Sequence, residues 1–440
     1  MTKKQLKEVF ALALPIIGGM VSQNILNLVD TAMVGTLGDA ALAAVGMGGF
    51  VNFMCVALVM GLSAGVQAMS SRRLGEGKSD QTAVPLNGGL LLSLIFSIPV
   101  SIILILSVPS FFPLLVSDSA VIDNGTPYLQ ARVAGMVAMG LNYSFRGYWN
   151  GINLSKIYMR TLVIMHICNI VLNYLLIFGM FGFPEMGTLG AGLGTTIASY
   201  IGSGIYTFLA FKMARQAGFL RGLPDKQTVQ TMLRVSLPVS IQQVFFATGM
   251  TVFFWIVGQM GTRELAANNV LVNLLLVCIL PGIGFGMASA TLVGQALGRN
   301  QPTEAKAWGW IVCKLAAGTI TVIALPAIFF PDFFLEIFIH DAQTVSVARL
   351  PLRIVACGIG LDSIGLVLFN ALSGAGYTKR PMYLSIFMQW ICFLPIAYLM
   401  GPQWGLGLES IWAGQMCYRA IQGFILMYMW SGGKWMSAKV

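Results

Sequence analysis

Long, predominantly apolar stretches recur along the whole chain of 440 residues, and short polar links separate them. A helix needs about 20 apolar residues to cross a membrane, so each stretch predicts one transmembrane helix. A transmembrane β-barrel would instead show short strands of alternating hydrophobicity. The pattern predicts twelve spans, at 8–36, 42–70, 83–108, 121–149, 157–181, 188–213, 229–258, 264–291, 305–330, 343–373, 381–402 and 408–431.

The links between the spans contain Gly, Pro, Asp and Lys, which are typical of turns. The longest polar link joins spans six and seven. We therefore predict an N-terminal lobe at 1–213, a cytoplasmic linker at 214–228 and a C-terminal lobe at 229–440. The first apolar stretch, Val9 to Gly38, is too long for the h-region of a cleavable signal, which has about 7–15 residues.

The two halves of the chain share an internal repeat. Matching positions keep one constant offset through two spans and two loops: Leu14-Pro15 with Leu237-Pro238, Val34-Gly35 with Val257-Gly258, Gly61 with Gly284, and Leu74-Gly75 with Leu297-Gly298. Each repeat holds six spans, so both halves enter the membrane from the same side. The predicted fold is an all-α membrane protein of twelve transmembrane helices, in two six-helix lobes around a central cavity. Parallel repeats of this kind place the substrate site between them and indicate alternating access.

Composition and charge agree with this architecture. Charged residues make up 10% of the chain and hydrophobic residues 57%, whereas soluble domains carry about 25% charged residues. Most Lys and Arg residues of the links fall on the side of the N-terminus, which places both termini in the cytoplasm of a multi-pass protein of the cytoplasmic (inner) membrane. The net charge of +10 is spread over many loops and predicts no nucleic-acid partner.

Motifs for metal binding or catalysis are missing from the sequence. The seven cysteines form no CxxC pair, and the two histidines, His166 and His340, are too few for a zinc site. The sequence contains no HExxH motif, phosphate-binding loop or nucleophile elbow. We therefore expect no enzyme and no cofactor, and any transport should be passive or coupled to an ion gradient. A membrane-embedded enzyme or receptor is the alternative of a different class.

Asp30 is the most informative polar residue because it lies inside an apolar span. A carboxylate there costs about 2.5–3.5 kcal/mol at the bilayer centre and usually serves an ion pathway. Gln23, Asn27 and Asp30 recur at i, i+4 and i+7, so they share one helical face. The alternative is an interfacial carboxylate near the helix end. The repeat aligns Asp30 with Phe253.

Polar residues of span five form a second stripe. His166, Asn169 and Asn173 recur at i, i+3 and i+7. Carboxamides beside a carboxylate can hydrogen-bond its ionised form or ligate an ion with it. Their alternative role is hydrogen bonding between helices. Thr195 and Thr196 of span six are weaker candidates because small hydroxyl residues commonly support close packing.

In the C-terminal half the candidate acid is Asp362 of span ten, which the repeat aligns with Asn142. Each lobe thus holds one intramembrane acid, in non-equivalent places. The polar residues expected in the cavity are Gln23, Asn27, His166 and Asn142.

Together these segments resemble the multidrug and toxic compound extrusion (MATE) transporters. The resemblance covers nearly the whole chain and rests on 14–35 (LPIIGGMVSQNILNLVDTAMVG), 169–192 (NIVLNYLLIFGMFGFPEMGTLGAG), 361–377 (LDSIGLVLFNALSGAGY) and the LP at Pro238. It implies export of cationic, amphipathic drugs in exchange for entering H⁺ or Na⁺, with no other cofactor. We expect a monomer surrounded by membrane lipid.

The resemblance also implies residue roles. Asp30, Asn169, Asn173 and Thr195 match the family's N-lobe site for a cation or proton, so Na⁺ at the first three is an alternative to H⁺. Pro15 matches a first-helix proline at which some members bend, although a static kink is equally open. Asp362 matches the C-lobe acid of the branch typified by Na⁺-coupled members.

That branch carries a Glu on span seven after two Phe residues. Here Phe245-Phe246 is followed by Ala247, which favours the N lobe as the coupling site and H⁺ over Na⁺. A flippase for lipid-linked saccharides, built on a related fold, is the second transport reading. Intramembrane basic residues that could bind pyrophosphate keep it open: Arg132, Arg146, Lys314, Arg349, Arg353 and Arg419. Some of these side chains should snorkel to an interface.

Overall fold

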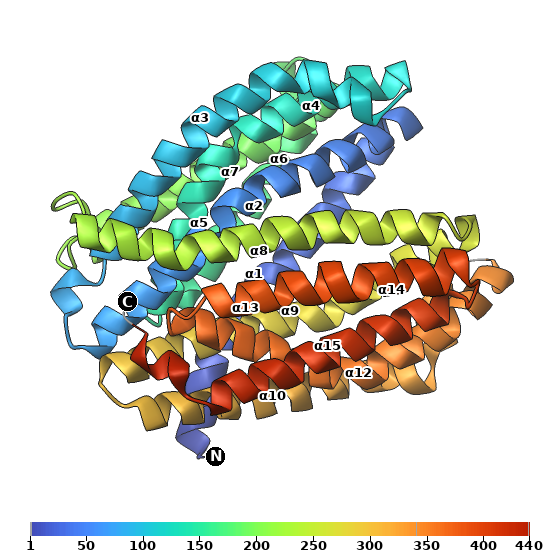
Figure 1. The fold of residues 1–440 in the computed structure, drawn as a ribbon. Coiled ribbons are helices and arrows are strands. Elements are labelled where there is room, and N and C mark those ends of the chain that lie inside the picture. The colour runs from blue at the N-terminus through green and yellow to red at the C-terminus, as the bar shows by residue number, and fades with distance from the viewer. Residues whose placement is uncertain (1, 340, 439) are drawn as a thin grey trace. The chain divides into compact units, whose positions relative to one another are not determined.

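The computed structural model describes residues 2–339, 341–438 and 440, and every regular element that they form is helical (Figure 1). His340 lies outside the described residues. By length and composition, nine of the described helical segments can cross a membrane. The other three predicted spans correspond to α4 with α5, to α7 and to α15. The prediction of an all-α membrane protein is confirmed.

The first half of the chain forms α1 (Lys3–Gly35), α2 (Asp39–Gly75), α3 (Val84–Leu115), α4 (Ser119–Ala134), α5 (Met136–Gly151), α6 (Ser155–Phe178) and α7 (Gly187–Met213). The second half forms α8 (Lys226–Gly258), α9 (Thr262–Gly298), α10 (Pro302–Phe329), α11 (Pro331–Glu336), α12 (Ala342–Gly374), α13 (Lys379–Phe387), α14 (Leu394–Tyr398) and α15 (Leu408–Ser431). Two π-helical segments, Met388–Phe393 and Leu399–Gln403, follow α13 and α14.

The predicted repeat is visible in the helix bounds. Helices α8 and α9 begin and end at the positions that the repeat offset assigns to the ends of α1 and α2. The chain also divides into two compact units at positions that keep this offset. The N-terminal unit is Gly18–Ser240, and the C-terminal unit is Met1–Ile17 with Ile241–Val440. Helices α1 and α8 therefore each begin in one unit and end in the other.

These compact units differ from the predicted lobes in three segments: the first half of α1, the predicted linker at 214–228 and the first half of α8. The division into lobes at 1–213 and 229–440, with a linker at 214–228, stays a prediction. Helix packing explains the positions of the two half-helices. A glycine on α2 lets the first half of α8 pack closely against it, and a glycine on α9 does the same for the first half of α1.

In the N-terminal unit, the backbone N–H of Gly61 donates to Ser240 Oγ at 3.2 Å. A Cβ on Gly61 would overlap the carbonyl oxygen of Ser236. In the C-terminal unit, a Cβ on Gly284 would overlap the side chain of Ile17. Gly61 and Gly284 keep the repeat offset, as do Ile17 and Ser240. The same glycine-mediated contact thus anchors the first half of α1 in one unit and of α8 in the other.

The segment before α8 is held on the N-terminal unit by hydrogen bonds. Asn87 of α3 donates through Nδ2 to the carbonyl of Gly218 at 2.9 Å and accepts the backbone N–H of Leu220 at 3.0 Å. Asp225 precedes α8, and hydrogen bonds from the side chain and backbone of Thr228 lower its pKa below the ordinary value. The ionised Asp225 carboxylate therefore caps the start of α8.

The fourth predicted span is divided into α4 and α5 at Gly135. The Thr196 hydroxyl of α7 donates to the carbonyl of Ala131 at 2.7 Å. The N–H of Gly135 instead reaches the carbonyl of Arg132 at 3.0 Å, one residue closer than in an α-helix. A Cβ on Gly135 would also crowd Thr196 Oγ1. Thr196 therefore packs α7 against α4 and supports the helix break at Gly135.

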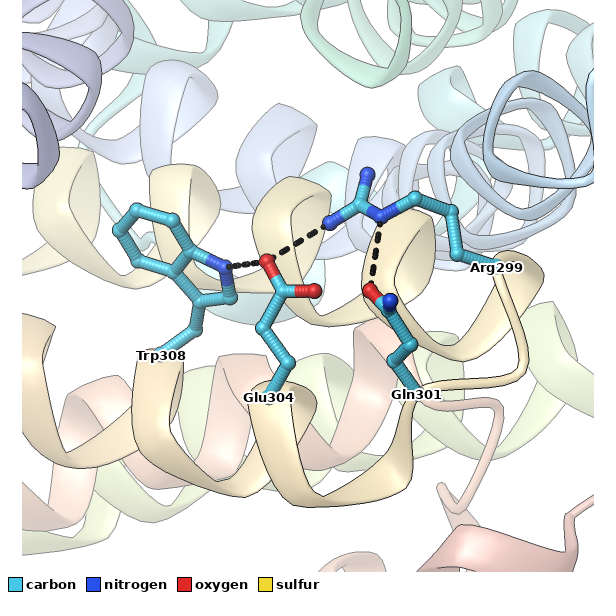
Figure 2. Close-up of polar contacts among 4 residues, drawn as sticks. All are labelled: Arg299, Gln301, Glu304 and Trp308. Carbon is cyan, nitrogen blue, oxygen red and sulfur yellow. Dashed lines mark hydrogen bonds and ion pairs between the residues drawn. The ribbon is translucent and has the colours of Figure 1, made fainter.

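A polar cluster closes the turn between α9 and α10 in the C-terminal unit (Figure 2). Arg299 donates through Nη2 to Glu304 Oε1 at 2.9 Å and through Nε to Gln301 Oε1 at 3.3 Å. The Trp308 indole donates to the same Glu304 oxygen at 3.0 Å. The ion pair is part-exposed, so it contributes at most about 1 kcal/mol. Its main effect is to fix the turn.

Candidate functional site

The candidate site centres on Asp30 and is built by α1, α6 and α7 of the N-terminal unit. Asn173 donates through Nδ2 to Asp30 Oδ1 at 2.9 Å. The Asn169 amide lies 3.1 Å from the same oxygen and donates to it when its nitrogen faces the carboxylate. Both asparagines are buried, at 1% and 0% exposure, whereas Asp30 is half-buried. Two neutral donors thus stabilise the ionised carboxylate.

Helix α7 completes the site from behind the two asparagines. In the same orientation, the oxygen of the Asn169 amide accepts from Thr195 Oγ1 at 2.9 Å. The Thr195 hydroxyl also lies 3.0 Å from the carbonyl of Ala191, so its single hydrogen has two possible acceptors. A Cβ on Gly194 would overlap Asn173 Oδ1. Glycine at this position therefore makes room for the Asn173 amide.

One buried oxygen of this site has no hydrogen-bond partner among the described residues. It is Asn173 Oδ1, on the amide that donates to Asp30. Carboxylate and amide oxygens are the groups that hard cations prefer. The described residues hold no group of three His, Cys, Asp or Glu side chains that could bind a metal ion. The donor set of Asp30, Asn169 and Asn173 suits a proton or a small hard cation.

A polar chain on the same faces of α1 and α6 contains three further predicted residues. His166 Nε2 lies 3.1 Å from Gln23 Oε1, and Gln23 donates through Nε2 to Asn27 Oδ1 at 3.2 Å. His166 Nδ1 lies 3.0 Å from Ser22 Oγ. Spacing alone predicted the two stripes, but it did not identify Ser22 as a member of the chain.

Asn142 lies elsewhere in the N-terminal unit. It donates through Nδ2 to the carbonyl of Ser199 at 3.0 Å and accepts from the Ser203 hydroxyl at 2.9 Å. Its hydrogen bonds therefore connect α5 to α7. Among the described residues, no recorded hydrogen bond joins Asn142 to Asp30 or its two asparagines.

In the C-terminal unit, Asp362 is engaged by a basic partner. Arg419 of α15 contacts the carboxylate twice, with Nε 2.8 Å from Oδ1 and Nη2 3.0 Å from Oδ2. The Asp362 side chain is 8% exposed. Sequence reasoning named both residues separately and missed the pair. The available signal was that an intramembrane charge normally has a partner of opposite sign.

Two other basic residues of the predicted spans, Arg349 and Arg146, also have side-chain partners. Arg349 forms an ion pair with Asp332 at 2.7 Å. Arg146 donates to Ser63 Oγ at 3.0 Å and lies over the Tyr143 ring, 4.6 Å from its centroid.

At the position that the repeat aligns with Asp30, the C-terminal unit holds an aromatic cluster. Phe253 is 1% exposed, and its ring lies 5.5 Å from that of Phe393 and 6.0 Å from that of Trp412. The two units are therefore chemically different at equivalent positions of their first helices.

Comparison with known proteins gives one family. The family model MatE matches residues 15–175 and 238–399, and the starts of these two segments keep the repeat offset. The chain is 27% identical over 440 residues to a probable multidrug resistance protein NorM from Thermotoga maritima, covering 98% of this chain and 93% of that protein. A protein of the same name from Pasteurella multocida is also 27% identical, with 97% and 93% covered. A solved structure described as the outward-facing conformation of a multidrug resistance MATE family transporter superposes with a TM-score of 0.89 at 22% identity, covering 98% of this chain and 97% of that one.

Proposed function

Since the chain belongs to the MatE family of multi-pass membrane transporters, we propose that it exports organic cations in exchange for H⁺, with Asp30 as the coupling carboxylate. The observation that carries this proposal is the placement of Asp30 against two buried amides. A carboxylate held by neutral donors keeps its negative charge available to a proton or a cation. Relatives named as multidrug resistance proteins support drugs as the substrate class.

The site can satisfy both charge states of Asp30. The ionised carboxylate accepts the N–H groups of Asn169 and Asn173. A protonated carboxyl group is itself a donor, and an amide can offer its oxygen instead of its nitrogen. Rotation of the Asn173 amide would present Oδ1, the buried oxygen without a partner, to that new donor. Both charge states of the Asp30 carboxyl group then have hydrogen-bond partners.

The C-terminal acid supports H⁺ coupling through the N-terminal unit. Both Asp362 oxygens are occupied by Arg419, which already neutralises the carboxylate. The family branch with Na⁺-coupled members has a Glu where this chain has Ala247, and Ala247 is buried at 1% exposure. Coupling by Na⁺ at Asp30, Asn169 and Asn173 is the alternative that the test below addresses.

We further propose that the protein is a monomer of the cytoplasmic membrane. The distribution of basic links supports the orientation with both termini in the cytoplasm. The flippase reading is less well supported, because Arg146, Arg349 and Arg419 are engaged by other side chains. Accumulation of a cationic dye in cells separates the two functions, since an exporter lowers it.

The direct test uses everted membrane vesicles and ethidium as the transported cation. Asp30→Asn keeps the shape of the side chain but removes the titratable group. We expect it to abolish ethidium-driven proton release while expression stays intact. Asp362→Asn leaves Arg419 without its partner, so exchange is compared per folded molecule, and on that basis Asp362→Asn should weaken it less than Asp30→Asn. Proton release at the wild-type rate in Asp30→Asn would remove Asp30 from the coupling mechanism.

The coupling ion is tested by ion replacement. We expect ethidium efflux to persist in sodium-free buffer under an imposed proton gradient, since the proposed site needs only one titratable carboxylate. The measurement is the rate of ethidium loss from loaded vesicles with and without Na⁺. A strict requirement for Na⁺, with no response to the pH gradient, would reverse the assignment in favour of Na⁺ at Asp30.

A further inference from the structure

Arg132 of α4 is a basic residue deep inside a predicted span. It lies thirteen residues after the first residue of α4, about 20 Å along an ideal helix. Its Nε is buried and has no hydrogen-bond partner among the described residues. None of the ion pairs recorded for that part of the chain involves Arg132. A charge at this depth without a partner of opposite sign is costly and is usually kept for a function.

Two hydroxyl groups of α7 connect the Arg132 end of α4 with the candidate site. In the orientation that completes the site, Thr195 Oγ1 donates to the Asn169 amide at 2.9 Å. The next residue, Thr196, donates to the carbonyl of Ala131 at 2.7 Å, and Ala131 directly precedes Arg132. Helix α7 therefore holds this end of α4 beside the candidate site.

The face of α4 that carries Arg132 points into the N-terminal unit. Tyr128 lies one turn earlier on the same face. A Cβ on Gly48 of α2 would overlap the Tyr128 ring, and a Cβ on Gly192 of α7 would crowd it from the other side. The face thus lies between α2 and α7, where the half-buried Arg132 side chain interacts electrostatically with the Asp30 carboxylate.

The net charge around Asp30 affects cations of different kinds unequally. Ionised Asp30 and Arg132 together carry no net charge, and the amides of the site are neutral. The affinity of a hard metal cation depends on the number and charge of its oxygen ligands, so a neutral surrounding attracts Na⁺ weakly. A proton instead forms a covalent bond with the carboxylate, and a large organic cation also gains from burial of its apolar surface.

We propose that Arg132 is a specificity-determining residue of the coupling site, whose fixed positive charge excludes Na⁺ from Asp30, Asn169 and Asn173 and leaves the carboxylate to the proton. This inference rests on the proposed function, in which Asp30 is the coupling group. Arg132 also lies in the last turn of α4, where a cation interacts favourably with the helix dipole. That structural role predicts lower stability when the charge is removed, but no gain of ion binding.

The test measures Na⁺ binding by thermal unfolding of the purified full-length protein in detergent at pH 8. NaCl replaces choline chloride at constant ionic strength. We expect no Na⁺-dependent rise in the unfolding temperature of the wild type. Arg132→Gln should show such a rise, because removal of a nearby unit charge strengthens cation binding roughly tenfold or more. Arg132→Met, a second neutral variant, should respond as Arg132→Gln does.

Two controls connect the response to charge and to Asp30. Arg132→Lys keeps the positive charge and should behave like the wild type. Combining Arg132→Gln with Asp30→Asn should remove the Na⁺ response, which would locate the bound ion at Asp30. A response that survives Asp30→Asn would place the ion elsewhere and overturn the inference.

A Na⁺ response of the wild type, or its absence from both folded neutral variants, would also overturn the inference. Stabilisation of the wild type by inorganic pyrophosphate, lost in Arg132→Gln, would instead assign the guanidinium to an anion. Failure of the proposed function is distinguishable from these results. It would appear as undiminished ethidium-driven proton release in Asp30→Asn, whatever Na⁺ does to the unfolding of the Arg132 variants.

Discussion

Two intramembrane carboxylates of this chain have partners of different kinds. Asp30 is held by the neutral amides of Asn169 and Asn173, whereas Asp362 is held twice by the Arg419 guanidinium. A buried ion pair carries no net charge, and removing one partner is strongly destabilising. A carboxylate among neutral amides keeps its charge, which a proton can cancel. This difference supports our proposal that Asp30, and not Asp362, is the coupling residue.

The glycine behind Asn173 provides a test at the residue scale. Gly194→Ala would place a Cβ on Asn173 Oδ1 and push the amide away from Asp30. We expect ethidium-driven proton release to fall several-fold, with only a small loss of thermal stability. Gly204→Ala is the matched control on α7, because its Cβ would meet nothing within 4 Å. Equal exchange rates in the two variants would show that the position of the Asn173 amide is irrelevant to coupling.

Helical spacing and the family resemblance together predicted the asparagines that contact Asp30. Spacing could not predict that Arg419 pairs with Asp362, because partner choice depends on how α12 and α15 are rotated and packed. The same limit applies to Asn142. The sequence predicted Asn142 as a polar residue of the cavity. Its hydrogen bonds to α7 depend on the close approach of α5 and α7, which the sequence did not predict.

At the scale of elements, the repeat governs where helices cross between units. Gly61 on α2 and Gly284 on α9 occupy equivalent positions, and each accepts the first half of the other repeat's first helix. The predicted register of the repeat contained both glycines. The register could not show that the first half of α1 packs in the C-terminal unit and the first half of α8 in the N-terminal unit. Equivalent spans can pack either within their own repeat or against the other repeat.

Gly61→Ala tests this crossing. The new Cβ would overlap the backbone oxygen of Ser236, which cannot move away as a flexible side chain could. Overpacking of this kind typically costs about 1–3 kcal/mol, so the melting temperature in detergent should fall. Gly46→Ala on the same helix is the control, since its Cβ would meet nothing within 4 Å and Ala favours a helix. If both variants melt together, the crossing at Gly61 tolerates a methyl group and our account of it is wrong.

The positions of the helices were largely predictable, and their interruptions were not. Apolar length predicts a span because a membrane demands it. The break at Gly135 depends instead on the Thr196 hydroxyl, which occupies the carbonyl of Ala131. Because this hydroxyl belongs to α7, the break cannot be predicted from the local sequence of α4 and α5.

At the scale of the molecule, α1 connects the two compact units. Pro15 is buried in the C-terminal unit, and Asp30 belongs to the N-terminal unit. The two residues are fifteen positions apart, about 22 Å along an ideal helix. A change of charge at Asp30 therefore acts on a helix whose other end is anchored in the second unit. Proline lacks one backbone donor and lets a helix bend at low cost.

If that bend is linked to the charge on Asp30, Pro15→Ala should slow transport without removing drug binding. Alanine restores the N–H and removes the ring clash, which stabilises the straight helix. We expect ethidium binding close to that of the wild type and a lower rate of efflux per folded molecule. Both are measured on the same reconstituted preparation.

Pro238→Ala is the matched control for the bending mechanism. Pro238 lies at the equivalent position of α8, a helix that also passes between the units but carries Phe253 instead of an acid. A bend driven by protonation should make Pro15→Ala the more damaging variant for exchange. If both prolines are static kinks, the two variants should change stability alike and keep transport per folded molecule. Normal turnover in Pro15→Ala would leave Asp30 as a binding site and discard bending of α1 as the coupling step.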